Sequence, residues 1–173
     1  MASLDVARTK PYADRVTWAT GDATARGDLP GGADLAVMTG NVAQVLVSDE
    51  DWSDTLTAVH AALRPGGWFV FETRRPEARA WEDWDLAPTT VDLPGGRTAV
   101  VARTVTGVDL PLVTFEGSTT IGDEILTSTS TLRFRTREEI ERDLVAHGFT
   151  VEDVRDAPDR PGMEHVVLAR VLG

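Results

Sequence analysis

Short apolar, β-branched runs alternate with one strongly amphipathic segment between residues 16 and 73. The amphipathic segment, residues 48–64, starts at Ser48 as a helix cap, carries acidic residues in its first turn and repeats apolar side chains at helical spacing. The apolar runs predict three strands, at 16–20, 34–38 and 68–73. Because strand, helix and strand follow one another with short connections, residues 34–73 predict a crossover unit in a parallel sheet.

The pattern changes after residue 80. Three long Thr- and Val-rich segments joined by glycine-containing turns predict an antiparallel insertion, at 98–106, 112–119 and 124–135. A capping box, Thr136 to Glu139, then starts a second helix that ends at Gly148. Two strands follow, at 149–154 and 165–171, and a short helix at 3–10 precedes all of these elements.

Together the elements predict an α/β fold: a Rossmann-like, mostly parallel sheet with helices on its faces and an antiparallel β insertion before the last helix. The length of 173 residues, the 42% hydrophobic content and the lack of a linker favour one domain. We expect residues 1–79 and 136–173 to form its α/β body, and residues 80–135 to form a lid.

Composition narrows the possible partners. A net charge of -11 disfavours nucleic acid, whose affinity depends on Lys and Arg at phosphates, although acidity is also common in proteins simply for solubility. The chain has no cysteine, so disulfides and thiolate sites are excluded. Residues 1–15 contain no apolar run that resembles a signal peptide, and no apolar segment of the sequence is long enough to span a membrane. We therefore expect a cytoplasmic protein that binds neither nucleic acid nor membrane.

Three turns carry a family resemblance: Gly21-Asp22-Ala23, Thr39-Gly40-Asn41 and Leu63-Arg64-Pro65-Gly66-Gly67. In this order, with the strands and helix between them, they resemble the small-molecule branch of the class I S-adenosylmethionine-dependent methyltransferases. The resemblance starts at the helix before that family's third strand and runs to its seventh. It implies S-adenosyl-L-methionine as cofactor, a small-molecule substrate and an enzyme that transfers a methyl group.

The resemblance also implies site residues. Asp22 corresponds to the acidic residue that accepts a hydrogen bond from the adenine amino group, and the amide of Ala23 to the one that serves a ring nitrogen. Residues Thr39, Gly40 and Asn41 correspond to the loop against the methionine part of the cofactor. The alternative is that these are ordinary surface turns.

Substrate contacts are expected from three side chains near the same edge: Gln44, Arg74 and Trp81. Arg74 lies with Glu72 and Arg75 at the carboxyl end of the strand predicted at 68–73, and any of the three can bind a carboxylate or an amine of the substrate. Trp81, with Trp84, either lines an apolar pocket under the lid or packs the lid onto the body, and packing is the favoured interpretation.

Methyl transfer requires mainly positioning and exclusion of water, so no catalytic residue is assigned. The histidines His60, His147 and His165 lack ligand spacing, and no metal site is expected.

One part of the family pattern has no counterpart. No Gly-x-Gly occurs in the sequence, so the chain is expected to be N-terminally truncated relative to the family and impaired in cofactor binding. The missing strands would lie between those at 16–20 and 34–38. Three explanations stay open: an internal start of an ordinary methyltransferase, a non-catalytic binding module, or a half enzyme completed by a partner. In the last two, a homodimer that completes the sheet is a possible assembly.

Overall fold

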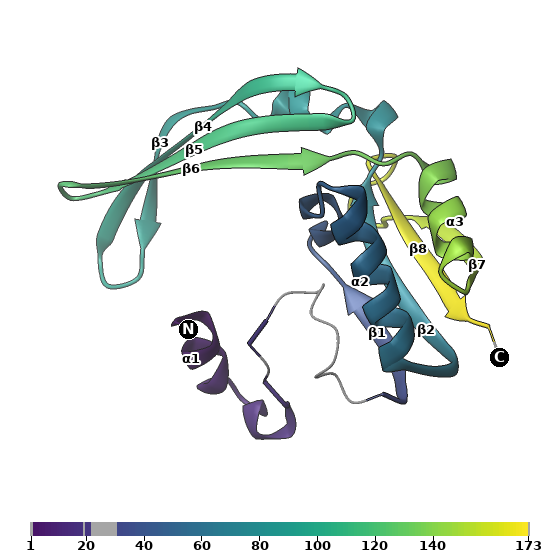
Figure 1. The fold of residues 1–173 in the computed structure, drawn as a ribbon. Helices are drawn as coiled ribbons and strands as arrows, with labels where there is room; N and C mark the ends of the chain where they lie inside the picture. Colours follow the sequence, from purple (N-terminus) through teal and green to yellow (C-terminus); the bar gives the residue numbers. More distant parts are fainter. Residues whose placement is uncertain (1, 19, 22–30, 173) are drawn as a thin grey trace.

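The computed structural model describes residues 2–18, 20–21 and 31–172. Its first sheet, sheet A, has four strands in the order β1-β2-β8-β7 (Figure 1). Their bounds are β1 Ala33–Met38, β2 Leu63–Arg74, β7 Phe149–Asp156 and β8 Glu164–Val171. β1 and β2 are parallel, whereas β2 with β8 and β8 with β7 are antiparallel. The prediction of a mostly parallel sheet is therefore wrong for the described strands, because only the segment with a helical crossover gives a parallel pair and the turn before β8 reverses the chain.

Two helices cover one face of sheet A: α2 (Asp49–Ala62) and α3 (Arg137–Ala146) (Figure 1). Alternate residues of β2 and β8 point toward them and are buried, and the core contains the following residues: Trp52, Leu56, Phe69, Phe71, Ile140, Leu144, Phe149, Val167, Ala169 and Val171. Both predicted caps are present. The Ser48 hydroxyl accepts from the amide of Asp51 at 2.9 Å, and Thr136 and Glu139 form the reciprocal capping box.

Strand β1 lies at the edge of sheet A, and no described strand pairs with its outer side. Its side chains alternate in burial: Ala36 and Met38 pack on the core, while Leu35 and Val37 are 54% and 61% exposed. An unpaired edge with apolar side chains is a surface that native proteins usually cover.

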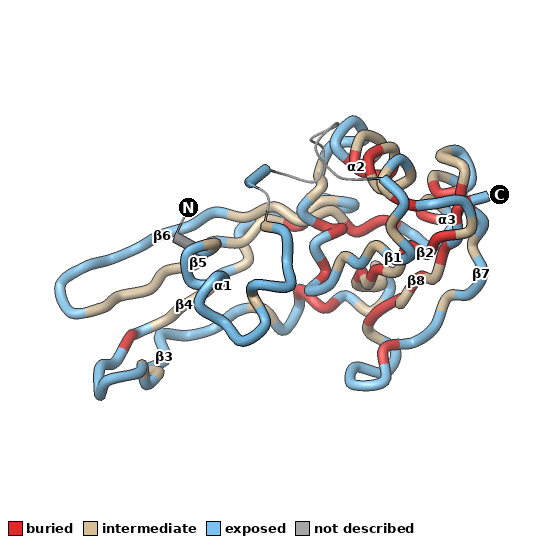
Figure 2. Tube along the Cα trace, turned by 90° about the horizontal axis from the view of Figure 1, so that it is seen from below, coloured by how far each residue is buried: buried red, intermediate tan, exposed pale blue. Residues whose placement is uncertain are grey.

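A second sheet, sheet B, is an antiparallel meander in the order β3-β4-β5-β6. The strands are β3 Leu86–Leu93, β4 Arg97–Asp109, β5 Leu112–Ile121 and β6 Glu124–Arg133. This confirms the three predicted strands of the insertion, and β3 adds a fourth. Sheet B extends away from sheet A, and buried residues are few along it (Figure 2). Its small core contains Trp81, Val113 and Phe134, close to where it meets the body.

The amino-terminal region forms α1 (Ala2–Arg8) and one turn of 3-10 helix at Ala13–Arg15. The predicted strand at 16–20 is wrong for its described residues, which form no strand. A β-branched segment forms a strand only where another strand bonds to it, and no described strand does so here. Trp18 instead donates its indole N–H to the carbonyl of Ala13 at 3.2 Å. Three more short 3-10 turns are η2 Val42–Val45, η3 Pro76–Ala78 and η4 Ala80–Asp83. In the described part of the chain, no helix is both long and apolar enough to cross a membrane.

Candidate functional site

Three strand ends meet at one rim of sheet A. The loop Thr39–Asn41 follows β1, and Glu72 and Arg74 end β2. β8 runs antiparallel to β2, so its first residue, Glu164, pairs with Arg74 at this same rim. Ligands of open α/β sheets bind beyond the carboxyl ends of the parallel strands, and this is the rim where such a site is expected.

The loop after β1 has a left-handed backbone at two successive residues. Gly40 has φ +70° and Asn41 has φ +57°, a conformation that glycine adopts freely and asparagine tolerates. The Gly40 amide donates to Glu72 Oε1 at 2.6 Å, which joins the ends of β1 and β2. A Cβ on Gly40 would meet no atom within 4 Å, so the open space beside this backbone is available to a ligand.

Asn41 and Gln44 are buried, at 3% and 0% exposed. Asn41 Nδ2 donates to Glu164 Oε1 at 2.9 Å, and Arg74 Nη1 donates to Gln44 Oε1 at 2.9 Å. The Arg74 guanidinium also lies over the ring of Trp84, 5.2 Å from its centroid. Burial lowers the pKa of Arg74 from its ordinary value, with Glu164 acting in the opposite direction.

Within the part of the chain that the structure describes, three buried polar side chains of the rim each keep one atom without a hydrogen-bond partner: Asn41 Oδ1, Gln44 Nε2 and Glu164 Oε2. Buried polar groups are almost always bonded, so three unpaired atoms at one rim are unusual and indicate a site for a polar ligand. Glu164 and Arg74 also line a cavity of about 240 Å³, together with Ala80, Asp83, Trp84, Arg160 and Met163. A larger hollow of about 350 Å³ on sheet B is lined by residues such as Thr104, Ser118 and Thr127, none of which carries a buried unpaired atom, so we place the site at the rim.

The structure brings several of the predicted site residues together. Gly40, Asn41, Gln44 and Arg74 lie together at the rim, where Gly40 bonds Glu72, Asn41 bonds Glu164 and Arg74 bonds Gln44, and Thr39 is exposed beside them. Asp22 and Ala23 lie outside the described residues. The cofactor contacts of Asp22 and Ala23 therefore stay a prediction.

Trp81 differs from its expected role as a substrate residue. It is 4% exposed and packs edge-on against Phe134, with ring centroids 4.7 Å apart, in the small core of sheet B. These contacts match the packing interpretation. Trp84, three residues later, is the tryptophan that lines the cavity.

Sequence reasoning missed Glu164 and Arg160. Arg160 lies in a proline-rich turn and Glu164 directly follows it; charged residues in such places are normally solvated, and no local pattern marks Glu164 as 1% exposed. Its burial results from Asn41, which is 123 positions earlier in the chain, and from Arg160, so only the tertiary fold reveals it.

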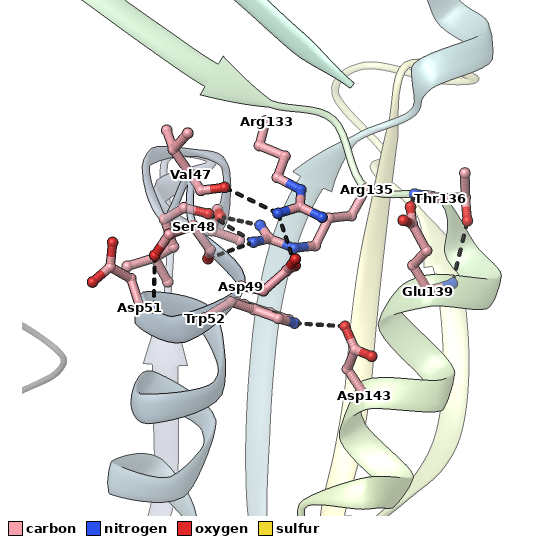
Figure 3. A network of polar contacts seen from close by, with 12 residues as sticks. Val47, Ser48, Asp49, Asp51, Trp52, Arg133, Arg135, Thr136, Glu139 and Asp143 are labelled. Carbon is pink, nitrogen blue, oxygen red and sulfur yellow. Dashed lines mark hydrogen bonds and ion pairs between the residues drawn. The ribbon is translucent and has the colours of Figure 1, made fainter. Parts of the chain in front are cut away.

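Two arginines, the last residue of β6 and one just beyond it, attach sheet B to the segment that follows the site loop (Figure 3). Arg135 is 3% exposed and donates to the carbonyl oxygens of Ala43, Leu46 and Ser48, at 3.4, 2.8 and 3.2 Å. Its guanidinium lies over the Trp52 ring at 4.8 Å. Burial lowers the pKa of Arg135 to about 10, so the side chain stays charged at neutral pH.

Arg133 supports the same attachment. It donates to the carbonyl oxygen of Val47 at 3.1 Å and pairs with Asp49 at 2.8 Å (Figure 3). We call Arg133 and Arg135 the arginine clamp. Because the clamp binds residues 43–49 and Gln44 belongs to that segment, the position of sheet B is linked to the geometry of the rim.

No group of three or more His, Asp or Glu side chains in the described ranges is arranged to hold a metal ion. The chemistry of the rim is that of hydrogen bonds and charges. It offers buried amide and carboxylate acceptors, an amide donor and a guanidinium beside an aromatic wall.

No family model matches the chain, and no curated protein matches its sequence. Solved structures do match. An S-adenosylmethionine-dependent methyltransferase from Clostridium acetobutylicum ATCC 824 is similar over 100% of this chain and 72% of its own, with a TM-score of 0.79 and 16% identity. The CcbJ methyltransferase from Streptomyces caelestis is similar over 98% of this chain and 69% of its own, with a TM-score of 0.76 and 18% identity.

A third structure is CalS10 with bound S-adenosylmethionine, an amino pentose methyltransferase from Micromonospora echinaspora. It is similar over 87% of this chain and 62% of its own, with a TM-score of 0.67 and 21% identity. Similarity at these identities establishes the fold. The chain has the fold of the S-adenosylmethionine-dependent methyltransferases, in agreement with the resemblance of its turns.

Proposed function

We propose that this chain transfers a methyl group from S-adenosylmethionine to a small molecule, with a weakened hold on the cofactor. The observation that carries the proposal is the rim itself: a left-handed Gly40–Asn41 loop with open space beside it, next to buried side chains with unpaired polar atoms. A fold shared with methyltransferases, one of them with the cofactor bound, supports this assignment. The fold alone would not, since one fold hosts many functions.

The chain's residues fit the methionine part of the cofactor. An amino acid moiety offers an ammonium and a carboxylate, and Asn41 Oδ1 and Gln44 Nε2 are an unpaired acceptor and an unpaired donor. The Gly40 backbone allows close approach because it carries no side chain. When bound, the sulfonium supplies an electrophilic methyl group. The protein's part is to position the acceptor, for which the Trp84 and Arg74 side chains line the cavity, and to exclude water.

The proposed weakness follows from the sequence. A Gly-x-Gly loop lets a backbone approach a cofactor closely, and this sequence contains none. The acceptor is proposed to be small because the cavity at the rim is about 240 Å³. The amino pentose acceptor of CalS10 makes an amine a reasonable first choice.

Calorimetric titration of the full chain with S-adenosylhomocysteine tests the proposal. We expect a dissociation constant of about 0.1–1 mM, which corresponds to about 4–5.5 kcal/mol. Asn41→Ala removes a rim side chain and is expected to weaken binding about tenfold. The control, Val45→Ala, changes a residue of the same η2 turn that is 60% exposed and is expected to bind as the parent does. Absence of measurable heat from the parent chain would overturn the proposal.

We also propose that a second copy of the chain pairs with the outer side of β1, with which no described strand pairs and where Leu35 and Val37 are exposed. Antiparallel pairing of two β1 strands would give both edges their backbone hydrogen bonds and place the four apolar side chains next to one another on one face of the joined sheet. Such a dimer is compatible with a methyltransferase and with a second candidate function, a binding module without catalysis, and the titration above distinguishes these two.

A further inference from the structure

Glu164 is a buried carboxylate, and hydrogen bonds reach one of its two oxygens. The residue is 1% exposed, and a single oxygen, Oε1, accepts from both Asn41 Nδ2 at 2.9 Å and Arg160 Nη1 at 2.7 Å. The other oxygen, Oε2, is buried and has no partner among the described residues. A carboxylate provides about four acceptor positions, and leaving one buried oxygen unbonded is costly. Glu164 therefore has the capacity to accept a further donor from a ligand in the cavity that it lines.

Arg160 pairs with Glu164 and, because its side chain is half-exposed, can move away from the carboxylate. Its side chain is 47% exposed, whereas that of Glu164 is 2% exposed. Arg160 lies in the turn between β7 and β8, and its Nε also donates to Asp159 Oδ2 at 3.3 Å. If the guanidinium leaves Glu164, it keeps Asp159 as a partner and enters water, while the buried Glu164 needs another cation in its place. Glu164 cannot leave, because it is the first residue of β8 and pairs with Arg74 in the sheet.

The unpaired atom at the cavity favours a cation over an anion. Of the three rim residues with an unpaired atom, Glu164 is the one that lines the cavity; its Oε2 is an acceptor, and an ammonium group has three donors. Arg74, the other cation of the cavity, is already bonded to Gln44 and lies over Trp84. Trp84, Ala80 and Met163 give the cavity an apolar wall for the carbon skeleton of a ligand.

We propose that Glu164 binds a cationic amine of the substrate, and that Arg160 occupies this position while the site is empty. The inference rests on the proposed function for its choice of ligand, a small-molecule substrate. Glu164 would thereby select amines over neutral or acidic analogues. Arg160 would act as an internal competitor for the same carboxylate.

The test uses three small probes and the full chain without cofactor. The probes are trans-4-aminocyclohexanol, which like lysine is protonated at neutral pH, the neutral trans-1,4-cyclohexanediol, and 4-hydroxycyclohexanecarboxylate. Binding is followed through the indole N–H signal of Trp84 in ¹H–¹⁵N spectra. We expect a saturable shift with the amine and binding of the diol and the carboxylate that is about tenfold or more weaker.

Two variants separate binding from a structural role. Glu164→Gln, which keeps the shape and one acceptor, is expected to lose the preference for the amine, a change of about tenfold to a hundredfold. Arg160→Ala removes the competitor and is expected to tighten amine binding. A purely structural ion pair predicts the opposite for Arg160→Ala, or no change. The matched control is Glu152→Gln, an exposed carboxylate on β7, which is expected to bind as the parent does.

Equal binding of the three probes, preference for the carboxylate, or amine binding by Arg160→Ala that is weaker than or equal to the parent's would overturn the inference. If Glu164→Gln does not fold, the probe series on the parent and Arg160→Ala still decide. Because no cofactor is present, the outcome is independent of the titration with S-adenosylhomocysteine. Amine binding without cofactor binding would refute the proposed function alone, and the reverse result would refute this inference alone.

Discussion

His165, the second residue of β8, is 6% exposed, and its Nδ1 is buried without a partner. Burial lowers the pKa of His165, and the nearby Arg75 lowers it further, while Glu77 Oε1, 4.0 Å from Nε2, acts against both. The ring is therefore neutral in the folded chain at neutral pH. An unfolded histidine has a pKa of about 6.5, so the unfolded chain takes up this proton first as the pH falls.

We predict that the free energy of unfolding contains a contribution from His165 that is fully present above about pH 7 and is lost as the pH falls through about 6.5 and below. The measurement is the urea midpoint of the parent and of His165→Gln between about pH 7.5 and 5.5. The parent is expected to lose more stability over this range than the variant. Equal losses in the two proteins would contradict the assignment.

Single residues of the site were predictable to the extent that they follow strands in sequence. Asn41, Gln44 and Arg74 come directly after predicted strands or one turn later, so the fold places them at the rim. The partners that fix them were not predictable. Glu164 begins β8 and Arg160 lies in the turn before it, both far along the chain, and the pairing depends on the antiparallel register of β2 with β8.

At the scale of elements, the arginine clamp holds sheet B on the body. Arg135→Ala would remove the guanidinium donor from the carbonyl oxygens of Ala43 and Leu46 and from its place over Trp52, and we predict a loss of about 2–4 kcal/mol in the free energy of unfolding. Arg135→Lys keeps the charge, but its point-like ammonium cannot reproduce the planar fork, so an intermediate loss of about 1–2 kcal/mol is expected.

Urea denaturation measures both losses. The control is Arg137→Ala, which removes only a surface pair with Glu141 and is expected to cost about 0.5 kcal/mol or less. If Arg135→Ala cost no more than Arg137→Ala, the clamp would have no energetic role.

The elements with local signals were predicted well. The helices have caps in sequence, Ser48 and the Thr136–Glu139 box, and both caps are formed. Residues 16–20 have strand composition without strand structure in their described part, because a strand needs a neighbour that local composition cannot supply. For the same reason the composition of β8 could not reveal that it runs antiparallel to β2, whereas the helical crossover between β1 and β2 does require a parallel pair.

At the scale of the whole molecule, the outer side of β1, with which no described strand pairs, predicts self-association. We expect the chain to be a dimer at micromolar concentration in size-exclusion chromatography with light scattering. Leu35→Lys with Val37→Lys places charges on the two exposed apolar positions and is expected to give a monomer with an unchanged circular dichroism spectrum.

The control pair is Ile125→Lys with Val145→Lys, which changes two equally exposed apolar residues on sheet B and α3. It is expected to remain dimeric. A monomeric parent, or dissociation by the control pair, would contradict the proposed assembly.

The proposed function requires the ends of β1, β2 and β8 to form one ligand site. This is tested most directly by a titration of the ¹⁵N-labelled full chain with S-adenosylhomocysteine, followed in ¹H–¹⁵N spectra. We expect saturable shifts concentrated at the amides of residues 39–44, 72–75 and 164–165. Shifts confined to other regions, such as the far end of sheet B, or no shifts at saturating ligand, would contradict the proposed site.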